Sequence, residues 1–550
     1  MTKPANLLPL LPLLVSLLGA CWVGLWPERG LLKRSREGLY VGWLFLVALS
    51  LGATAVEREM AVPLPSILSF LPEGPSLLWD APARWMAAFL LGTNAFMTAV
   101  PLLAGQGPSR GRLEAAMLLV LYGASLAALS AGNLLMLCLA WSVGEMATAA
   151  IHVARAQAEE RRYILWSTWG GIASLFLLIG AMSLLTVSQG RTAWADVPAS
   201  PWAWAMLLVS AMLRMVIPSL SGRFLEHVET RFPSLAMGAL LWGRLFTVSS
   251  QPFPLEGPWG AIGAGILFAT GLVAALTPDF SKAFAYIASN RLAMALFASL
   301  LGLAEGPAIA WMTILTLIMA AALLRAGEAL SQSQGRWGPL GRTWALLGLL
   351  GAPLTPGFLA HWAFLRGAWL EGIHPLVFWG SLSLLLTAVP VWRQLATPFD
   401  FSRVSRGPGG WAQWAAVGGM AVLSAWNLAL GMAPHLAWSV WGGGMGLSSP
   451  WEGSPELLGT LTYIALLGPL LGGYGLGRVL EGLPGLWERA LRVVRGILVL
   501  DWLVYFAEET LVRLQAFADE ILAAIERRFY LAWTLIWGIA MILLYVERLQ

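Results

Sequence analysis

The sequence is crossed from end to end by apolar runs of about 17 to 22 residues, each long enough to cross the hydrocarbon core of a bilayer as a helix. Reading these runs against Pro, Gly and charged residues predicts spans at 7–26, 39–56, 85–105, 113–131, 134–154, 164–187, 202–219, 234–250, 260–276, 282–303, 307–330, 344–365, 375–395, 411–432, 457–480 and 529–545. Backbone polar groups in lipid must be satisfied within their own segment. The predicted fold is therefore an all-α integral membrane protein with about sixteen transmembrane helices.

The composition excludes a water-soluble domain. Hydrophobic residues make up 58% of the chain and charged residues 12%, and the mean hydropathy is +0.70, whereas soluble domains carry about 25% charged residues. The net charge is +4. In a membrane protein an excess of Lys and Arg usually marks the cytoplasmic loops, so we expect no nucleic-acid partner. The two cysteines provide neither a disulfide framework nor a CxxC motif, and we expect no metal or cofactor.

Basic residues alternate between the loops. Those that follow odd-numbered spans hold Arg29, Lys33, Arg34, Arg36, Arg110, Arg112, Arg155, Arg161, Arg162, Arg336, Arg342, Arg403 and Arg406. Loops that follow even-numbered spans hold few. By the positive-inside rule the N-terminus faces outward, and an even number of spans returns the C-terminus to the same side.

The segment 483–528 differs from the rest. It favours helix, but charged residues alternate with apolar ones at helical spacing, so it is too charged to span. We expect an amphipathic helix along the cytoplasmic face before the last span, within 529–550. A surface helix without a partner and a brace that docks on neighbours are both compatible with this pattern.

Ionisable residues occur inside the predicted spans. Each costs at least about 2.5 kcal/mol to place in mid-bilayer, so its presence calls for a reason. They are Glu145, His152, Arg214, Arg244, Lys282, Arg291, Arg325, Glu328, His361 and Arg393. One interpretation is a hydrated row of polar centres that conducts protons, and the other is a set of snorkelling ends and neutralised pairs. We favour conduction for the central Glu145, Arg214, Arg325 and His361, and the structural interpretation for Arg244 and Arg393.

Proline and glycine predict two broken helices. Interrupted helices expose carbonyls at membrane depth, which is tolerated beside protein or a hydrated cavity. The residues concerned are Pro218 and Gly222 in the seventh span, and Pro353, Pro356 and Gly357 just before His361 in the twelfth.

Four stretches carry a family resemblance: 279–286 (DFSKAFAY), 133–135 (NLL), 231–236 (RFPSLA) and 351–361 (GAPLTPGFLAH). They are similar to motifs of the antiporter-like subunits of respiratory complex I, of Mrp Na⁺/H⁺ antiporters, of membrane hydrogenases and of DAB-type inorganic-carbon uptake complexes. The span count and the amphipathic helix resemble subunit L most closely. The resemblance implies a multi-pass protein of a bacterial-type cytoplasmic (inner) membrane.

The resemblance also implies a domain plan. Two inverted five-helix repeats would occupy 113–250 and 251–398, each with one broken helix. They would be preceded by three helices in 1–112 and followed by two in 399–482, then by the amphipathic segment and the last span.

The sequence departs from the family at three lysine positions, which are Arg214, Arg325 and His361 here. An arginine stays protonated, so it can bias a water path but cannot be loaded and emptied. Relay would then fall to Glu145, His152 and His361. Lys282 would stand at the cytoplasmic mouth.

The resemblance implies a proton- or cation-translocating subunit that couples ion flow to the work of a partner. DAB-type carbon uptake with a zinc-bearing carbonic-anhydrase-like subunit and redox-driven pumping with a quinone module are close alternatives. An Mrp-type antiporter with Mrp subunits, and a scaffold that has lost transport, stay open. The chain has no catalytic motif of its own, so as an enzyme it would only be a translocase subunit.

Overall fold

The computed structural model describes residues 10–25, 32–54, 60–63, 75–105, 110–155, 160–187, 194, 200–220, 225, 228–248, 259–303, 305–334, 338–396, 411–432, 457–482 and 513, and the statements below concern these residues. Residues Met1–Leu491 form one compact unit and Arg492–Gln550 a second. The boundary falls inside the predicted amphipathic segment. That segment and the last span lie outside the described residues, apart from the exposed, helical Arg513.

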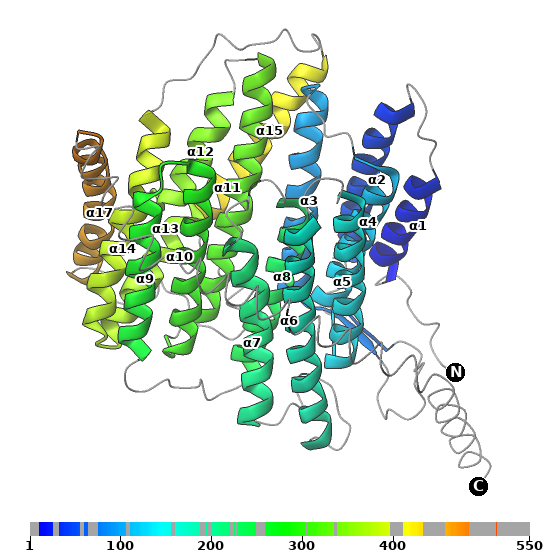
Figure 1. Cartoon of the computed structure of the whole chain (residues 1–550), viewed down its shortest axis with the longest axis horizontal. Coiled ribbons are helices and arrows are strands. Elements are labelled where there is room, and N and C mark those ends of the chain that lie inside the picture. Colours follow the sequence, from blue (N-terminus) through cyan, green and yellow to red (C-terminus); the bar gives the residue numbers. More distant parts are fainter. Residues whose placement is uncertain are drawn as a thin grey trace. The chain divides into compact units, whose positions relative to one another are not determined.

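Helices account for nearly all of the described chain, and Figure 1 shows them standing side by side. The first eight are α1 (Leu11–Leu25), α2 (Leu32–Thr54), α3 (Ala81–Leu103), α4 (Arg112–Leu129), α5 (Leu134–Arg155), α6 (Glu160–Val187), α7 (Pro201–Leu220) and α8 (Val228–Val248). The others are α9 (Trp259–Leu276), α10 (Phe280–Leu300), α11 (Gly306–Gln334), α12 (Gly338–Leu350), α13 (Pro356–Leu370), α14 (His374–Ala396), α15 (Trp411–Met432) and α17 (Leu457–Glu481). Each of the first fifteen predicted spans contains helix. Nine described helices are long and apolar enough to cross a membrane, which confirms the predicted class.

The twelfth span is broken, as predicted. α12 ends in a Schellman motif, in which Gly351 adopts a φ of 71° and the Ala352 amide donates to the Leu347 carbonyl at 3.0 Å. Pro353 lies in the break, and α13 restarts at Pro356 with Thr355 as its N-cap.

The two half-helices touch at the break. A Cβ on Gly357 would lie 2.2 Å from the Gly348 carbonyl oxygen, so this contact requires glycine. The sequence therefore ends one helix and begins the next inside the bundle.

The seventh span differs from the prediction. α7 continues to Leu220, so Pro218 lies in its last turn instead of interrupting it, while Gly222 lies outside the described residues. A proline leaves the carbonyl four residues earlier without its helical donor. That carbonyl belongs to Arg214, and the Ser234 hydroxyl of α8 lies 3.4 Å from it as a donor. The neighbouring helix thus compensates for the proline, and α7 is continuous.

The chain is not purely helical. β1 (Met60–Pro63) and β2 (Ser76–Trp79) form an antiparallel pair with Met60 opposite Trp79. The Gly132 amide donates to the Ser76 carbonyl at 2.8 Å, so the hairpin is joined to the loop between α4 and α5. Such four-residue strands are too short to stand out from apolar runs in the sequence.

Two ion pairs show that α3 and α8 run antiparallel. Asp80, the N-cap of α3, pairs with Arg244 near the end of α8 at 3.3 Å. Arg110, which follows α3, pairs with Glu229 in the first turn of α8. An odd and an even helix therefore cross in opposite directions, in agreement with the alternating charges of the loops.

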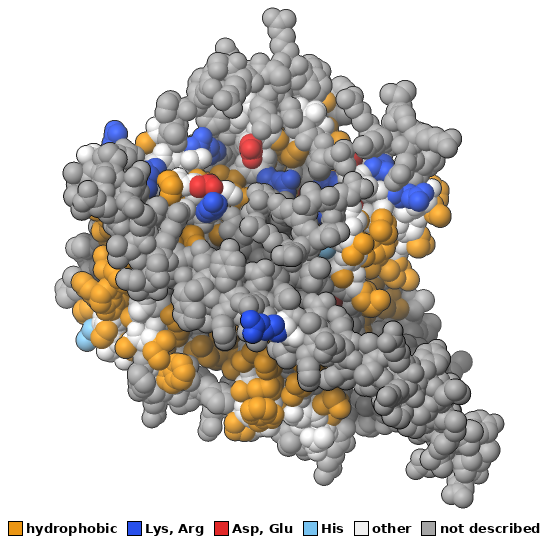
Figure 2. Space-filling view, in the orientation of Figure 1, with side chains coloured by type: hydrophobic (Ala, Val, Ile, Leu, Met, Phe, Trp, Pro, Cys, Tyr) orange, Lys and Arg blue, Asp and Glu red, His pale blue; other side chains and the backbone are white. Residues whose placement is uncertain are grey.

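The outer faces of several helices are apolar. Figure 2 shows hydrophobic side chains gathered in patches, with Lys and Arg mostly toward the top of the view. Exposed members include Met146 and Val153 on α5 and Met182 on α6. Lipid or neighbouring subunits are the surroundings that such faces require.

Candidate functional site

An ion pair lies between α5, α6 and α7. Glu145 of α5 pairs with Arg214 of α7, whose side chain is 4% exposed against 18% for Glu145. The Arg214 guanidinium also lies over the Trp141 ring, 4.2 Å from its centroid, and donates to the Ser174 hydroxyl of α6 at 3.3 Å. The pair neutralises two charges between the helices, and it leaves the carboxylate partly accessible.

Small residues make room for this pair. A Cβ on Gly170 of α6 would lie 2.1 Å from the Glu145 Oε2 atom. On the other side, a Cβ on Gly238 of α8 would lie 3.0 Å from the Arg214 Cβ. Two glycines in helices that carry no charge at this site therefore set the space that the ion pair occupies.

A second polar centre lies at the break between α12 and α13. His361 is 2% exposed, and its imidazole faces the Gly357 backbone carbonyl of its own helix. Its ring lies against the break, because a Cβ on Gly351 would be 2.3 Å from Nδ1. Arg291 of α10 lies near enough to act on the charge of His361.

Arg291 is bound to the same break. Its Nη2 atom donates to the Leu349 carbonyl at the end of α12 at 3.2 Å and to the Thr387 hydroxyl of α14 at 3.1 Å. No carboxylate of the described residues forms an ion pair with it. The carbonyl end of α12 carries a partial negative charge, which offsets the buried cation.

Asn290, next to Arg291, extends this centre. Its Nδ2 atom donates to the Leu267 carbonyl at 2.8 Å, to the Thr270 hydroxyl at 2.9 Å and to the Ser383 hydroxyl at 2.7 Å. Sequence reasoning noted Arg291 but missed Asn290 and its partners. The available signal was an Asn-Arg pair in the middle of an apolar span.

The remaining predicted residues lie apart from the two centres. His152 is buried on α5, near Arg155 and Arg231. Lys282 is exposed in the first turn of α10, whose N-cap is Asp279. Arg325 is half-buried near Glu229, and Glu328 is exposed, so the structure does not bring Glu328 into the polar row. Between Glu145 and His361, no hydrogen bond or ion pair joins the two centres among the residues that the structure describes.

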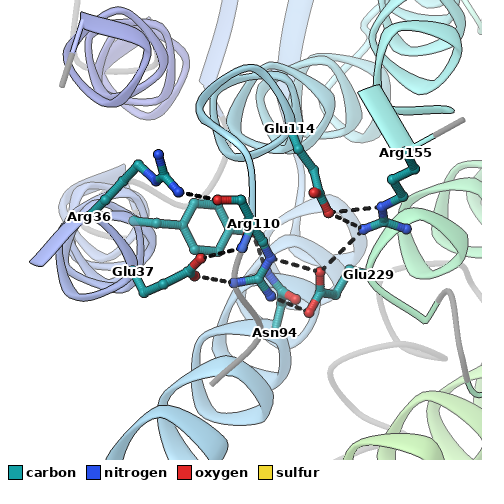
Figure 3. Close-up of polar contacts among 8 residues, drawn as sticks. Arg36, Glu37, Asn94, Arg110, Glu114, Arg155 and Glu229 are labelled. Carbon is teal, nitrogen blue, oxygen red and sulfur yellow. Dashed lines mark hydrogen bonds and ion pairs between the residues drawn. The ribbon is translucent and has the colours of Figure 1, made fainter. Parts of the chain in front are cut away.

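A buried charge cluster, which sequence reasoning missed, lies around Arg110 (Figure 3). Arg110 binds Glu37 of α2 at 2.6 Å and Glu229 of α8, and its carbonyl accepts from Arg36. Arg155 joins Glu114 at 2.6 Å and approaches Glu229 at 3.9 Å. The partners lie far apart in the sequence, and loop position alone suggested an ordinary basic loop.

The cluster fixes charges in place. Burial alone would lower the pKa of Arg110, but Glu229 and Glu37 outweigh it and hold the pKa above its ordinary value. The Arg110 guanidinium also lies 4.9 Å from the centroid of the Tyr40 ring. The Tyr122 hydroxyl donates at 3.0 Å to the Glu229 carbonyl, which Pro233 leaves without a helical donor. These contacts connect α2, α4 and α8, so the cluster has the character of a structural element and not of a proton carrier.

Arg244 and Arg393 both make interhelical contacts. Besides Asp80, Arg244 binds the Ala131 carbonyl at 2.8 Å. Arg393 binds the Ala275 carbonyl of α9 at 3.1 Å. Contacts of this kind are expected if the two arginines serve structure and not conduction, which stays a prediction.

Comparison with known proteins gives matches in structure alone. No family model and no curated protein matches the sequence. A chain of the Mrp complex from Dietzia sp. DQ12-45-1b superposes with a TM-score of 0.71 and 15% identity, over 97% of this chain and 63% of that one. A chain of the membrane-bound sulfane sulfur reductase, an archaeal respiratory membrane complex, superposes with a TM-score of 0.65 and 15% identity, over 98% of this chain and 99% of that one.

These similarities define the class. The chain is a multi-pass membrane protein with the fold found in multisubunit membrane complexes of the Mrp and respiratory kinds. The resemblance to antiporter-like subunits is thereby confirmed at the level of the fold, whereas the particular resemblance to subunit L stays a prediction. This chain spans under two thirds of the Mrp chain that it matches.

Proposed function

We propose that the chain is the proton- or cation-translocating membrane subunit of a multisubunit complex. The observation that carries this proposal is the Glu145–Arg214 ion pair, in which a partly accessible carboxylate meets a buried guanidinium between three transmembrane helices. Keeping two charges at this depth is costly. Passage of an ion through the site would explain why both charges are kept there. A purely structural role would not require them.

The two residues would divide the work. Arg214 would keep its charge and supply the positive partner of the Glu145 side chain. A proton that reaches Glu145 neutralises it and weakens the pair, which leaves the guanidinium with its contacts to the Ser174 hydroxyl and the Trp141 ring and open to water. Loss of the proton restores the pair. Glu145 is thus the group that loads and empties, while Arg214 biases the equilibrium.

The second centre would continue the path. His361 can carry a proton on its imidazole, which lies at the break between α12 and α13. His152 and Lys282 remain proposed members at the inner side. Arg325 would act through charge, whereas the exposed Glu328 fits the path less well than the others.

Proton flux in proteoliposomes tests the proposal. The full chain, purified with its associated subunits, is reconstituted as wild type, as Glu145→Gln and as Glu145→Asp, with the exposed Glu371→Gln as matched control. We expect Glu145→Gln to lower flux by about a hundred-fold or more and Glu145→Asp to retain part of it, as for other positioned proton-transfer groups. Wild-type flux in Glu145→Gln would overturn the assignment.

Three couplings remain proposals: DAB-type uptake of inorganic carbon, redox-driven pumping and Mrp-type Na⁺/H⁺ exchange. The Mrp and sulfane sulfur reductase folds support a complex of this general kind, and carbon uptake rests on the sequence resemblance alone. The co-purifying subunit separates them. A zinc protein, an iron-sulfur or quinone module, or small Mrp-type subunits would each select one coupling.

A transport-inactive scaffold is the competing proposal from another class. The Arg110 cluster and the Arg244 contacts support it, because both join helices without a group that needs to titrate. The buried imidazole of His361 at the helix break argues against it, since burying a polar ring is costly for a scaffold that needs only apolar packing there.

A further inference from the structure

Glu305 is a buried carboxylate that the path described so far does not use. It directly precedes α11 and is 8% exposed. The charge pattern of the loops assigns this N-terminal end of α11 to the outer side of the membrane. Its Oε1 atom lies 3.8 Å from the Arg366 Nη1 atom of α13. A Cβ on Gly367 would lie 3.3 Å from Oε2, so the glycine leaves space beside the carboxylate.

Two threonines connect the level of Glu305 with the helix break. Thr313 and Thr316 follow Glu305 by eight and eleven residues, which places all three toward one side of α11 over about 16 Å. The Thr316 methyl lies at the break, 3.2 Å from where a Cβ on Gly357 would stand. The Thr313 hydroxyl is buried and has no hydrogen-bond partner in the described structure, which is the state of a hydroxyl that a water molecule would satisfy.

The helix that faces α11 carries the other residues of the suggested route. α11 packs against α13, which bears His361 near its beginning and Arg366 near its end. The stripe on α11 and these residues on α13 therefore run together from the break to the outer surface.

We propose that Glu305 is the outermost proton-carrying group of the second half of the chain, which receives protons from His361 through water beside Thr313 and releases them outside. The inference rests on the proposed function. The proton leaves the His361 imidazolium, passes along water and converts the Glu305 carboxylate to the neutral acid. Release to bulk water restores the carboxylate, which Arg366 favours.

The charges around Glu305 fit this role. Burial raises the pKa of Glu305 above its ordinary value, Arg366 opposes that rise, and the exposed Glu371 after α13 supports it. A carboxyl with a raised pKa is protonated more often near neutral pH than a surface carboxyl.

The test compares Glu305→Gln and Glu305→Asp with the nearby exposed Glu371→Gln, in the full chain with its associated subunits. We expect Glu305→Gln to lower proton flux by about a hundred-fold and Glu305→Asp to retain part of it. Glu371→Gln should lower proton flux far less than Glu305→Gln, because its exposed side chain acts on Glu305 only through its charge. Infrared spectroscopy after a pH jump supplies a second readout, in which Glu305→Gln should remove a carboxyl band that remains in Glu371→Gln.

The outcomes separate the two proposals. Wild-type flux and an unchanged carboxyl band in Glu305→Gln, with flux lost in Glu145→Gln, overturn the role of Glu305 and leave the proposed function standing. Unchanged flux in both variants overturns both. Loss of the band with loss of flux supports Glu305 as the outer group, and the band keeps the test informative for a variant that assembles poorly.

Discussion

Arg214 of α7 and Glu145 of α5 are 69 residues apart in the sequence numbering, yet they form an ion pair between their helices. The arginine is more deeply buried than the carboxylate. The carboxylate is therefore the less enclosed member of the pair, and its protonation is the event that would change the pair.

Removing either charge alone should cost more than removing both. We expect Arg214→Gln to lower the free energy of unfolding by about 2 to 3 kcal/mol, because it leaves Glu145 without its partner. The double variant Glu145→Gln with Arg214→Gln should recover part of that loss. Unfolding in mixed micelles, followed by tryptophan fluorescence, measures this cycle, and strictly additive losses would contradict a direct interaction.

A methyl group at Gly170 should disturb the pair without changing any charge. A Cβ there would lie 2.1 Å from Glu145 Oε2, whereas a Cβ on Gly171 would meet nothing within 4 Å. We expect Gly170→Ala to lower proton flux strongly and Gly171→Ala to leave it near wild type. Equal flux in the two variants would mean that the position of the carboxylate does not matter.

The break beside His361 should depend on Gly351. Alanine at this position would need a φ of 71° and would place its Cβ 2.3 Å from the imidazole, whereas Gly348→Ala makes only an ordinary contact with Asn427 at 3.6 Å. We expect Gly351→Ala to lose both stability and flux, and Gly348→Ala to keep them. Thermal midpoints and proteoliposome flux check this, and a harmless Gly351→Ala would show that His361 tolerates displacement.

The Arg110 cluster should behave as a structural element. Arg110→Met leaves Glu37 and Glu229 buried without their main partner, so we expect a loss of about 3 to 5 kcal/mol in the free energy of unfolding. The exposed Arg112→Met, two residues away, serves as the control and should change it little. An Arg110→Met protein of wild-type stability with abolished flux would instead place the cluster in the ion path.

Helix positions could be predicted from the sequence because membrane thickness fixes the length of an apolar run. The pairing of Glu145 with Arg214 could not be predicted in this way. The position of a residue in its span gives its depth in the membrane, but the packing of the helices decides which neighbour its side chain faces. Glu328 shows the same limit, since it lies one turn from Arg325 but is exposed. Pro218 was misplaced as a break because Ser234, which lies near the free carbonyl, belongs to another helix.

Buried loop residues were the hardest to anticipate. Arg110 carries the same loop signal as its exposed neighbour Arg112, and only its contacts with Glu37 and Glu229, 73 and 119 residues away, distinguish it. Glu305 likewise has no sequence pattern that sets it apart from a surface carboxylate.

Radiolytic hydroxyl footprinting of the assembled complex tests the central claim most directly, because it labels side chains that lie beside water, including water inside a protein. Trp141, over which Arg214 lies, and Trp79 of β2 are equally buried from bulk solvent in this structure. If water reaches the Glu145–Arg214 pair, Trp141 is oxidised clearly faster than Trp79. Equal and slow oxidation of the two tryptophans would mean a dry site and would contradict a proton path through it.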